Sequence, residues 1–319
     1  MNKGYVSGFN SLIKSAHPDT DRPFDRFRGD LAVFAVLAVL CAMGVYYYGM
    51  RAAAVAGVCA FTAWAADIFC LILCRKHLQP RDLSPLITGL SIACMLPACV
   101  PYTIAAAACL FAVCAAKHPF GGRGCEIICP AAAGYIFAEL SFPQQMGSYP
   151  RPFEPLSMSN IVPEQLYRNM SGSLSGDISD LELLVGATPG TLGCTGAVTV
   201  IVCVIVLVFI GALPGGIVIP EIAIFAAYTF SVTGMGGIFR CPVDIFAAAL
   251  LSCGGHIPSK VSSRIIFGII SGVLIIMIRE MSTLSYPAVY AAVIAAPFAF
   301  LLDTADDPDA ATDKKSTKE

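Results

Sequence analysis

Charged residues are scarce in this chain. Only 13% of its 319 residues are Asp, Glu, Lys or Arg, about half the share found in a soluble domain, and the mean hydropathy is +0.73. This composition argues against a water-soluble globule, and the 56% share of hydrophobic residues excludes a disordered chain. The net charge of −2 leaves no excess of positive charge for nucleic acid. We therefore expect a protein embedded in membrane lipid that binds no nucleic acid.

Two other signals are missing. Residues 1–29 contain no apolar stretch like the core of a cleavable signal peptide, so we expect them to form a cytoplasmic N-terminal segment. Most of the 14 cysteines lie inside apolar runs, which is typical of small hydrophobic residues and not of a disulfide scaffold. Cys125 and Cys129 share one helical face and could hold a metal or an iron–sulfur cluster, but an apolar helix face is the simpler interpretation. No metal site is predicted.

Long runs without charge locate the membrane spans. A helix needs about 20 apolar residues to cross the hydrocarbon layer, and Pro97, Pro101 and the turn at 213–216 divide the longest runs. The predicted segments are 31–50, 52–74, 83–99, 102–116, 125–140, 192–213, 216–233, 241–254, 265–279 and 284–302. The prediction is an all-α polytopic membrane protein with about ten transmembrane segments, some of them short or broken, in two similar halves.

The basic residues predict the orientation. Most Lys and Arg residues fall in the segments that share a side with both termini, so the positive-inside rule places that side in the cytoplasm. The membrane domain is then 30–303, with an external loop at 141–190. The Asp- and Lys-rich residues 304–319 are expected to form a disordered cytoplasmic tail.

Four short strings carry a family resemblance. They are Asp82-Leu83-Ser84 with Thr88-Gly89-Leu90, Lys117-His118-Pro119-Phe120-Gly121-Gly122-Arg123-Gly124 with Pro130-Ala131, Pro189-Gly190-Thr191-Leu192-Gly193, and a closing series that includes Arg264, Arg279, Tyr286-Pro287 and Leu302-Asp303. In this order they resemble RnfD, a membrane subunit of the Rnf ion-translocating electron-transport complex, and its homologue NqrB.

The resemblance implies a subunit of a multi-subunit oxidoreductase and translocase in the bacterial cytoplasmic (inner) membrane. Such a complex moves electrons between ferredoxin or NADH and a second carrier through flavin, and couples this to Na⁺ or H⁺ transport. Its partners would be the other subunits and the membrane lipid. Two alternatives remain, namely a flavin-free transporter or channel on the same fold and a scaffold subunit.

Five glycines in two of these strings are candidate cofactor-binding residues: Gly121, Gly122, Gly124, Gly190 and Gly193. Glycine lets the backbone approach a ligand closely, and a following helix N-terminus offers free N–H groups to a phosphate. The alternative is that both strings are tight turns that connect helices.

The family usually carries FMN as a phosphoester on a threonine in an external loop. Thr188 in Gly186-Ala187-Thr188-Pro189 is the candidate acceptor, and Ser171 and Ser173 form an alternative acceptor stretch. A further alternative is FMN or riboflavin held without a covalent bond, or no flavin. In that case Thr188 would cap a helix.

Ionisable residues inside the apolar segments are candidates for an ion pathway. Asp67 lies deepest, and Glu126 and Glu221 open two other segments. Glu126, Glu221 and Asp244 could instead be acids of a first helical turn, which the helix dipole favours. His256 is a candidate proton carrier, or a loop residue near the inner surface.

Overall fold

The structure is a computed structural model. It describes residues 23–75, 82–120, 122, 126–154, 161–163, 186, 188–233, 241–282 and 284–306. The residues 1–22 and 307–319, which make up most of the two predicted terminal segments, lie outside the described residues.

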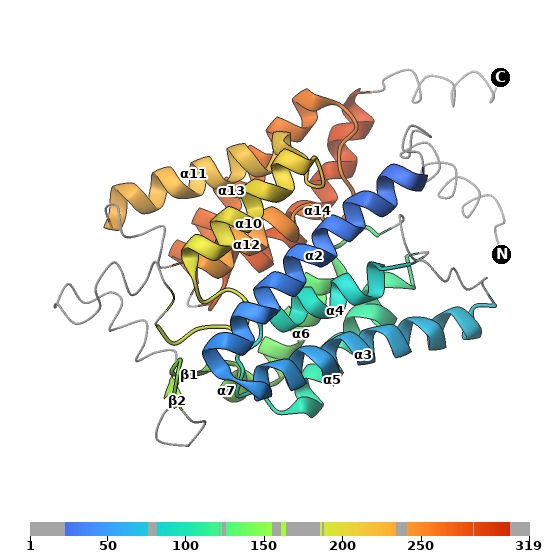
Figure 1. Ribbon diagram of the computed structural model, residues 1–319. Coiled ribbons are helices and arrows are strands. Elements are labelled where there is room, and N and C mark those ends of the chain that lie inside the picture. The colour runs from blue at the N-terminus through green and yellow to red at the C-terminus, as the bar shows by residue number, and fades with distance from the viewer. Residues whose placement is uncertain are drawn as a thin grey trace.

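The described chain is built from apolar helices and one short hairpin (Figure 1). The elements are α2 (Pro23–Tyr48), α3 (Met50–Leu73), α4 (Ser84–Met95), α5 (Tyr102–Phe111), the π-helix η1 (Ala112–Lys117), α6 (Pro130–Ser141), α7 (Pro143–Met146), β1 (Ser148–Pro150), β2 (Ile161–Pro163), α10 (Ala197–Ile210), α11 (Gly215–Thr233), α12 (Pro242–Leu250), α13 (Val261–Met281) and α14 (Pro287–Asp306). Each predicted segment coincides with one apolar helix, and α5 with η1 forms the fourth. The prediction of an all-α polytopic membrane fold is confirmed.

The helices differ in length in the way the sequence indicated. Four of them, in α2, α3, α11 and α13, are long and apolar enough to cross a membrane. Most of the others are shorter, and prolines or glycines stand at several of their ends. Pro85, Pro130 and Pro242 start α4, α6 and α12 at a first-turn position, and Gly211 ends α10 in the left-handed conformation, with φ 78°.

The two halves of the chain repeat one packing scheme. In the first half α2 packs on α4, α3 on α5, and α6 on both α4 and α5. In the second half α10 packs on α12, α11 on α13, and α14 on both α12 and α13, which repeats these contacts. The close packing of α3 with α2 and α4 in the first half is not matched to the same extent by α11 in the second. The halves lie side by side in Figure 1, and they meet through α2 with α10 and through α6 with α14. Equivalent helices therefore contact each other across the interface.

Each half of the described chain has five apolar helices, counting α5 with η1 as one. Because five is an odd number, the second half runs through the molecule in the opposite direction to the first. The start of α2 and the end of α14 lie at one end of the molecule, and the β1–β2 hairpin lies at the opposite end (Figure 1). This arrangement agrees with a chain whose two ends emerge on the same side of the membrane.

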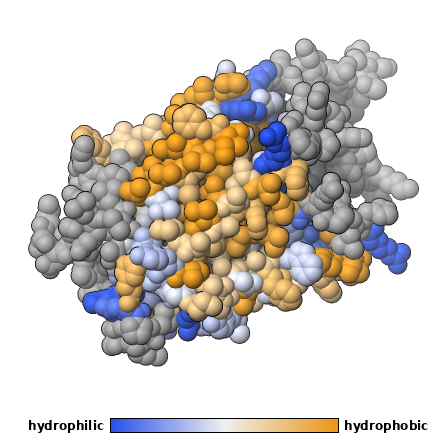
Figure 2. Space-filling model, viewed as in Figure 1, coloured by the Kyte–Doolittle hydropathy of each residue, from blue (hydrophilic) through white to orange (hydrophobic). Residues whose placement is uncertain are grey.

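The outer surface of the helices is apolar. Figure 2 shows hydrophobic residues over the middle of the visible face and hydrophilic residues toward opposite ends of the molecule. Large exposed side chains include Phe61 and Phe69 of α3, Phe209 of α10 and Phe230 of α11. A face of this kind suits lipid or a neighbouring membrane subunit.

Some helix boundaries differ from the prediction. α6 begins at Pro130 and not at residue 125, so Glu126 precedes the helix and does not lie in its first turn. Residues 192–196 precede α10 because they pair with another part of the chain. α12 ends at Leu250, and a turn follows it. α6 and α10 therefore begin later, and α12 ends earlier, than hydropathy indicated.

Candidate functional site

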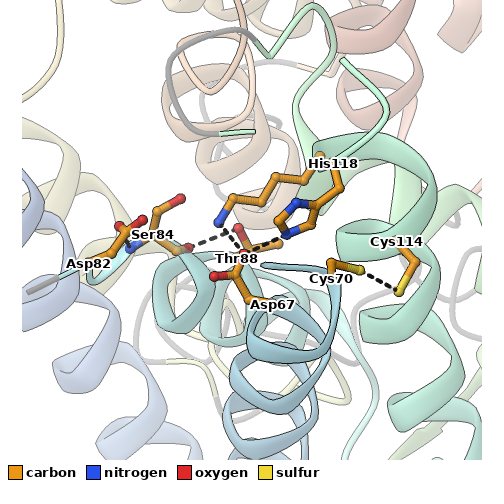
Figure 3. Close-up of polar contacts among 8 residues, drawn as sticks. Asp67, Cys70, Asp82, Ser84, Thr88, Cys114 and His118 are labelled. Atoms are coloured by element: carbon orange, nitrogen blue, oxygen red, sulfur yellow. Dashed lines mark hydrogen bonds and ion pairs between the residues drawn. The ribbon is translucent and has the colours of Figure 1, made fainter. Parts of the chain in front are cut away.

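A buried ion pair joins the second and fourth helices of the first half. Lys117 Nζ lies 3.0 Å from Oδ1 of Asp67, and His118 Nε2 lies 3.0 Å from the same oxygen. Asp67 is 5% exposed and Lys117 is 1% exposed. Figure 3 shows the His118 side chain reaching Asp67 from the residue that follows η1. The structure thus connects the deepest predicted acid to the first residues of the glycine-rich string, 50 positions away.

The π-helix explains how this pair forms. His118 donates its backbone N–H to the Val113 carbonyl at 3.2 Å, five residues back, so each turn of η1 holds more residues than an α-helical turn. The wider turn ends with Lys117 and His118, whose side chains both contact Asp67 of α3. Short π-helices are frequent at functional sites because they re-aim side chains in this way.

The Asp82 string supports the same region. Oδ1 of Asp82 accepts the backbone N–H of Ser84 at 3.0 Å and so caps the start of α4. One turn later, the Thr88 hydroxyl donates to the Ser84 carbonyl at 3.0 Å (Figure 3). A Cβ on Gly89 would lie 2.6 Å from the Cys59 carbonyl oxygen, so only glycine lets α4 approach α3 this closely. This string therefore shapes the helix contact beside the ion pair.

The first glycine-rich string is described only in part. Gly122 is buried, has φ 90°, and donates its N–H to the Lys117 carbonyl at 3.2 Å. This hydrogen bond closes a turn after η1, in a conformation that favours glycine. Gly121 and Gly124 lie outside the described residues.

The second glycine-rich string crosses between the halves. Leu192 N–H donates to the Leu96 carbonyl at 2.9 Å, and Gly193 N–H donates to the Cys94 carbonyl at 3.0 Å. The Tyr48 hydroxyl lies 3.2 Å from both the N and the O of Gly190. A Cβ on Gly193 would lie 2.5 Å from Cys94 Sγ. These amides are used within the protein, so the string joins α4 to the start of the second half, and a cofactor-binding role for Gly190 and Gly193 stays a prediction.

Thr188 does not fit a covalent FMN. The residue is 5% exposed, and Pro189 and the Tyr48-bound Gly190 follow it directly. A phosphoester acceptor needs a hydroxyl that a transferase can reach, which a buried threonine in such a segment does not offer. The alternative acceptors Ser171 and Ser173 lie outside the described residues.

A second buried acid lies in the second half of the chain. Glu221 follows Pro220 inside α11 and is 0% exposed. Its Oε1 accepts the hydroxyl of Ser252 at 2.8 Å and the hydroxyl of Ser271 at 2.7 Å. An ionised acid at the centre of a membrane helix costs about 2.5–3.5 kcal/mol on the insertion scale, so a side chain of this kind has to face protein. Glu221 meets this condition because α13 and the turn after α12 enclose it.

Other polar groups converge on the start of α14. Asp244 accepts the Ala288 N–H at 3.1 Å and lies 3.6 Å from Arg279. Glu139 of α6 accepts the Ser285 N–H at 3.3 Å and the Tyr290 hydroxyl at 2.9 Å. Asp244 is thus a first-turn acid of α12 that also holds α14. Sequence reasoning missed Glu139, although an acid near the end of an otherwise apolar segment was the available signal.

The remaining candidates have structural contacts. His256 Nε2 lies 2.7 Å from Oδ2 of Asp303, and its ring stacks on Phe300 with centroids 4.2 Å apart. Cys129 is buried against Gly254, while Cys125 lies outside the described residues. No group of three or more His, Cys, Asp or Glu side chains suited to a metal occurs in the part of the chain that the structure describes.

The sequence comparisons agree with this architecture. Residues 13–311 match the model of the NQR2, RnfD, RnfE family. A subunit of the Na⁺-translocating ferredoxin:NAD⁺ oxidoreductase complex of Acetobacterium woodii is 29% identical over 173 residues, which is 54% of this chain and 53% of that protein. A subunit of the ion-translocating oxidoreductase complex of Klebsiella pneumoniae is 33% identical over 39% of this chain and 37% of its own length. The corresponding subunit of Rhodobacter capsulatus is 26% identical over 57% of this chain and 59% of its own length.

The chain therefore matches between 37% and 59% of the length of these curated relatives. The family model, however, covers nearly the whole chain, and the ten apolar helices and the four strings agree with it. The protein is a multi-pass membrane protein that belongs to the NQR2, RnfD, RnfE family.

Proposed function

We propose that this protein is the RnfD subunit of an Rnf-type complex, in which electron transfer drives Na⁺ or H⁺ across the membrane. The observation that carries the proposal is the family match over residues 13–311. Relatives from several bacteria are named as ion-translocating oxidoreductase subunits. From those names we propose, for this chain too, the activity, the transported ion and the partner subunits.

The buried ionisable groups support the transport part of this proposal. Asp67 with Lys117 in the first half and Glu221 in the second lie in apolar helices, where charge is costly. Acids at such positions are typical of ion and proton pathways. Glu126 is a third candidate, which precedes α6.

The orientation is proposed from the basic residues. With both termini in the cytoplasm, the end of α3 with Asp67 and Lys117 faces the cytoplasm, and the β1–β2 hairpin lies outside. The compartment would be the bacterial inner membrane, because the named relatives come from bacteria.

For the cofactor, we propose that FMN or riboflavin associates with this chain without an ester to Thr188. The burial of Thr188 supports this restriction. When present, the flavin would supply one- and two-electron chemistry. No electron-transfer step is assigned to a residue of this chain.

The proposal is tested in inverted membrane vesicles from a strain that lacks this chain. Adding the gene back should restore reduced-ferredoxin-dependent NAD⁺ reduction together with uptake of ²²Na⁺ or protons, and a tagged chain should purify with other membrane subunits. Ion flux without any electron transfer would favour a flavin-free transporter or channel. Assembly of partners by the chain, with electron transfer and ion flux unaffected by Glu221→Gln, would favour a scaffold subunit.

A further inference from the structure

The carboxyl group of Glu221 has an asymmetric environment. Both serine hydroxyls, from Ser252 and Ser271, donate to Oε1. Oε2 is buried and has no hydrogen-bond partner among the described residues. One oxygen of the carboxyl group is therefore fully engaged, and the other is left for a ligand.

No basic side chain of the described elements neutralises Glu221. The ionisable groups on α12 and α13, which pack against α11, are Asp244, Arg264, Arg279 and Glu280. The segment between these two helices adds Cys253, His256, which is paired with Asp303, and Lys260. Arg264 donates to the Pro258 carbonyl at 2.8 Å, and Arg279 donates to Cys241 Sγ at 3.0 Å. Glu280 accepts the Tyr228 hydroxyl. The charge of Glu221 acts on the Cys253 thiol, but a thiol is an acid and supplies no positive charge.

Tight backbone packing encloses the acid. A Cβ on Gly272 would lie 3.1 Å from the Glu221 carbonyl oxygen, and a Cβ on Gly268 would lie 2.5 Å from the Ile217 carbonyl oxygen. The backbones of α11 and α13 therefore lie close together at Glu221 and one turn before it. An ionised carboxylate enclosed in this way has neither a counter-charge nor a hydration shell, so its charge has to be cancelled by a bound cation or proton.

The hydrogen bonds favour a proton over a metal ion. A metal ion is held by several oxygens arranged around it, whereas here both hydroxyls donate to a single carboxylate oxygen. That pattern matches a carboxylic acid in which Oε1 is the accepting oxygen and Oε2 carries the hydrogen.

We propose that Glu221 is a proton-binding site of this chain, present as a neutral carboxylic acid that exchanges one H⁺ at Oε2. As a step in translocation, this exchange rests on the function proposed above. The ion carried at Glu221 is then H⁺. Its exchange involves no oxidation or reduction.

Labelling with dicyclohexylcarbodiimide tests the proposal, because this apolar reagent converts protonated carboxyl groups in membranes into stable N-acylureas. Membranes that contain the full-length chain are treated with the reagent, and the modified residue is identified by mass spectrometry. We expect one adduct on Glu221, lost in Glu221→Gln and retained in the matched control Glu280→Gln. Labelling should fall as the pH rises.

The same experiment separates a proton from a sodium ion. With NaCl exchanged for choline chloride at constant ionic strength, labelling of Glu221 should not change. Protection of Glu221 by Na⁺ would overturn the proposal, because it would identify a cation site.

Infrared spectroscopy gives an independent readout if the reagent cannot reach the enclosed carboxyl. The protein should show a protonated-carboxyl band that Glu221→Gln lacks and Glu280→Gln keeps. Absence of both the adduct and this band would refute the proposal. Neither readout needs electron transfer, so a complex that fails the vesicle assay could still contain this proton site, and an active complex could lack it.

Discussion

Lys117 Nζ lies 3.0 Å from Asp67 Oδ1, and both side chains are almost completely buried between α3 and η1. This pair changes the interpretation of Asp67. The acid that the sequence predicts to line an ion pathway is held by a lysine and by His118. Its charge is already compensated, so Asp67 binds no further cation without Lys117 moving or losing its proton.

The first prediction concerns this pair. Asp67→Asn leaves the Lys117 charge buried alone, so we expect a loss of about 3–5 kcal/mol in stability, and Lys117→Met should cost a similar amount. The double variant removes both charges and should be more stable than either single variant. Thermal unfolding of the detergent-solubilised chain, followed by size-exclusion chromatography, measures this. Additive losses in the double variant would mean that the two residues do not act as a pair.

The second prediction concerns the second glycine-rich string, which joins the two halves of the chain. Gly193→Ala places a Cβ 2.5 Å from Cys94 Sγ, and such overpacking typically costs about 1–3 kcal/mol. The matched control is Gly57→Ala, because a Cβ at Gly57 meets nothing within 4 Å. The yield of folded chain should drop for Gly193→Ala and hold for Gly57→Ala. Cys94→Ala should partly rescue Gly193→Ala, and equal yields of the two glycine variants would contradict the packing.

The third prediction concerns the short distance between two cysteines of different helices. Cys70 Sγ lies 3.4 Å from Cys114 Sγ, one helical turn from the ion pair (Figure 3). In a chain that keeps only these two cysteines, a copper–phenanthroline oxidant should form an internal disulfide. Trypsin cleaves after Lys76 or Arg81, between the two cysteines. The fragments should stay joined until a reductant is added, and they should separate at once in a Cys70→Ser control.

The fourth prediction concerns orientation. Single cysteines placed at Ser157 and Ser171 should react with an impermeant maleimide added outside intact cells, while cysteines at Lys76 and Lys260 should react only after the membrane is opened. Reaction of the Ser157 variant only in opened cells would invert the proposed topology. A variant labelled from both sides would indicate mixed insertion, which the surplus of basic residues on one side disfavours.

The fifth prediction concerns flavin. Because Thr188 is buried, Thr188→Val should change the mass of the chain only by the difference between the two side chains and should leave any in-gel flavin fluorescence unchanged. Valine keeps the shape of threonine and has no oxygen to esterify. Loss of a flavin mass in Thr188→Val alone would restore Thr188 as the acceptor. Loss in Ser171→Ala or Ser173→Ala alone would identify the external serine stretch.

The sequence alone determined the membrane class and the number of apolar segments. Hydrocarbon admits few charges, so each span appears as a charge-free run, and prolines and glycines divide the long runs. The strings from Asp82 to Asp303 also led to the correct family. These features are local in the chain and can be found without knowing which helices touch.

Only the tertiary structure decided which residues meet. Asp67 finds Lys117 from 50 positions away, and Glu221 meets Ser252 and Ser271 on other elements. Hydropathy could not predict these contacts, because in a membrane the lipid-facing side and the buried side of a helix are both apolar, so the pattern that reveals a buried face in water is lost. The side that each helix turns toward its neighbours was set instead by close glycine contacts and by a few polar groups that had to pair away from lipid.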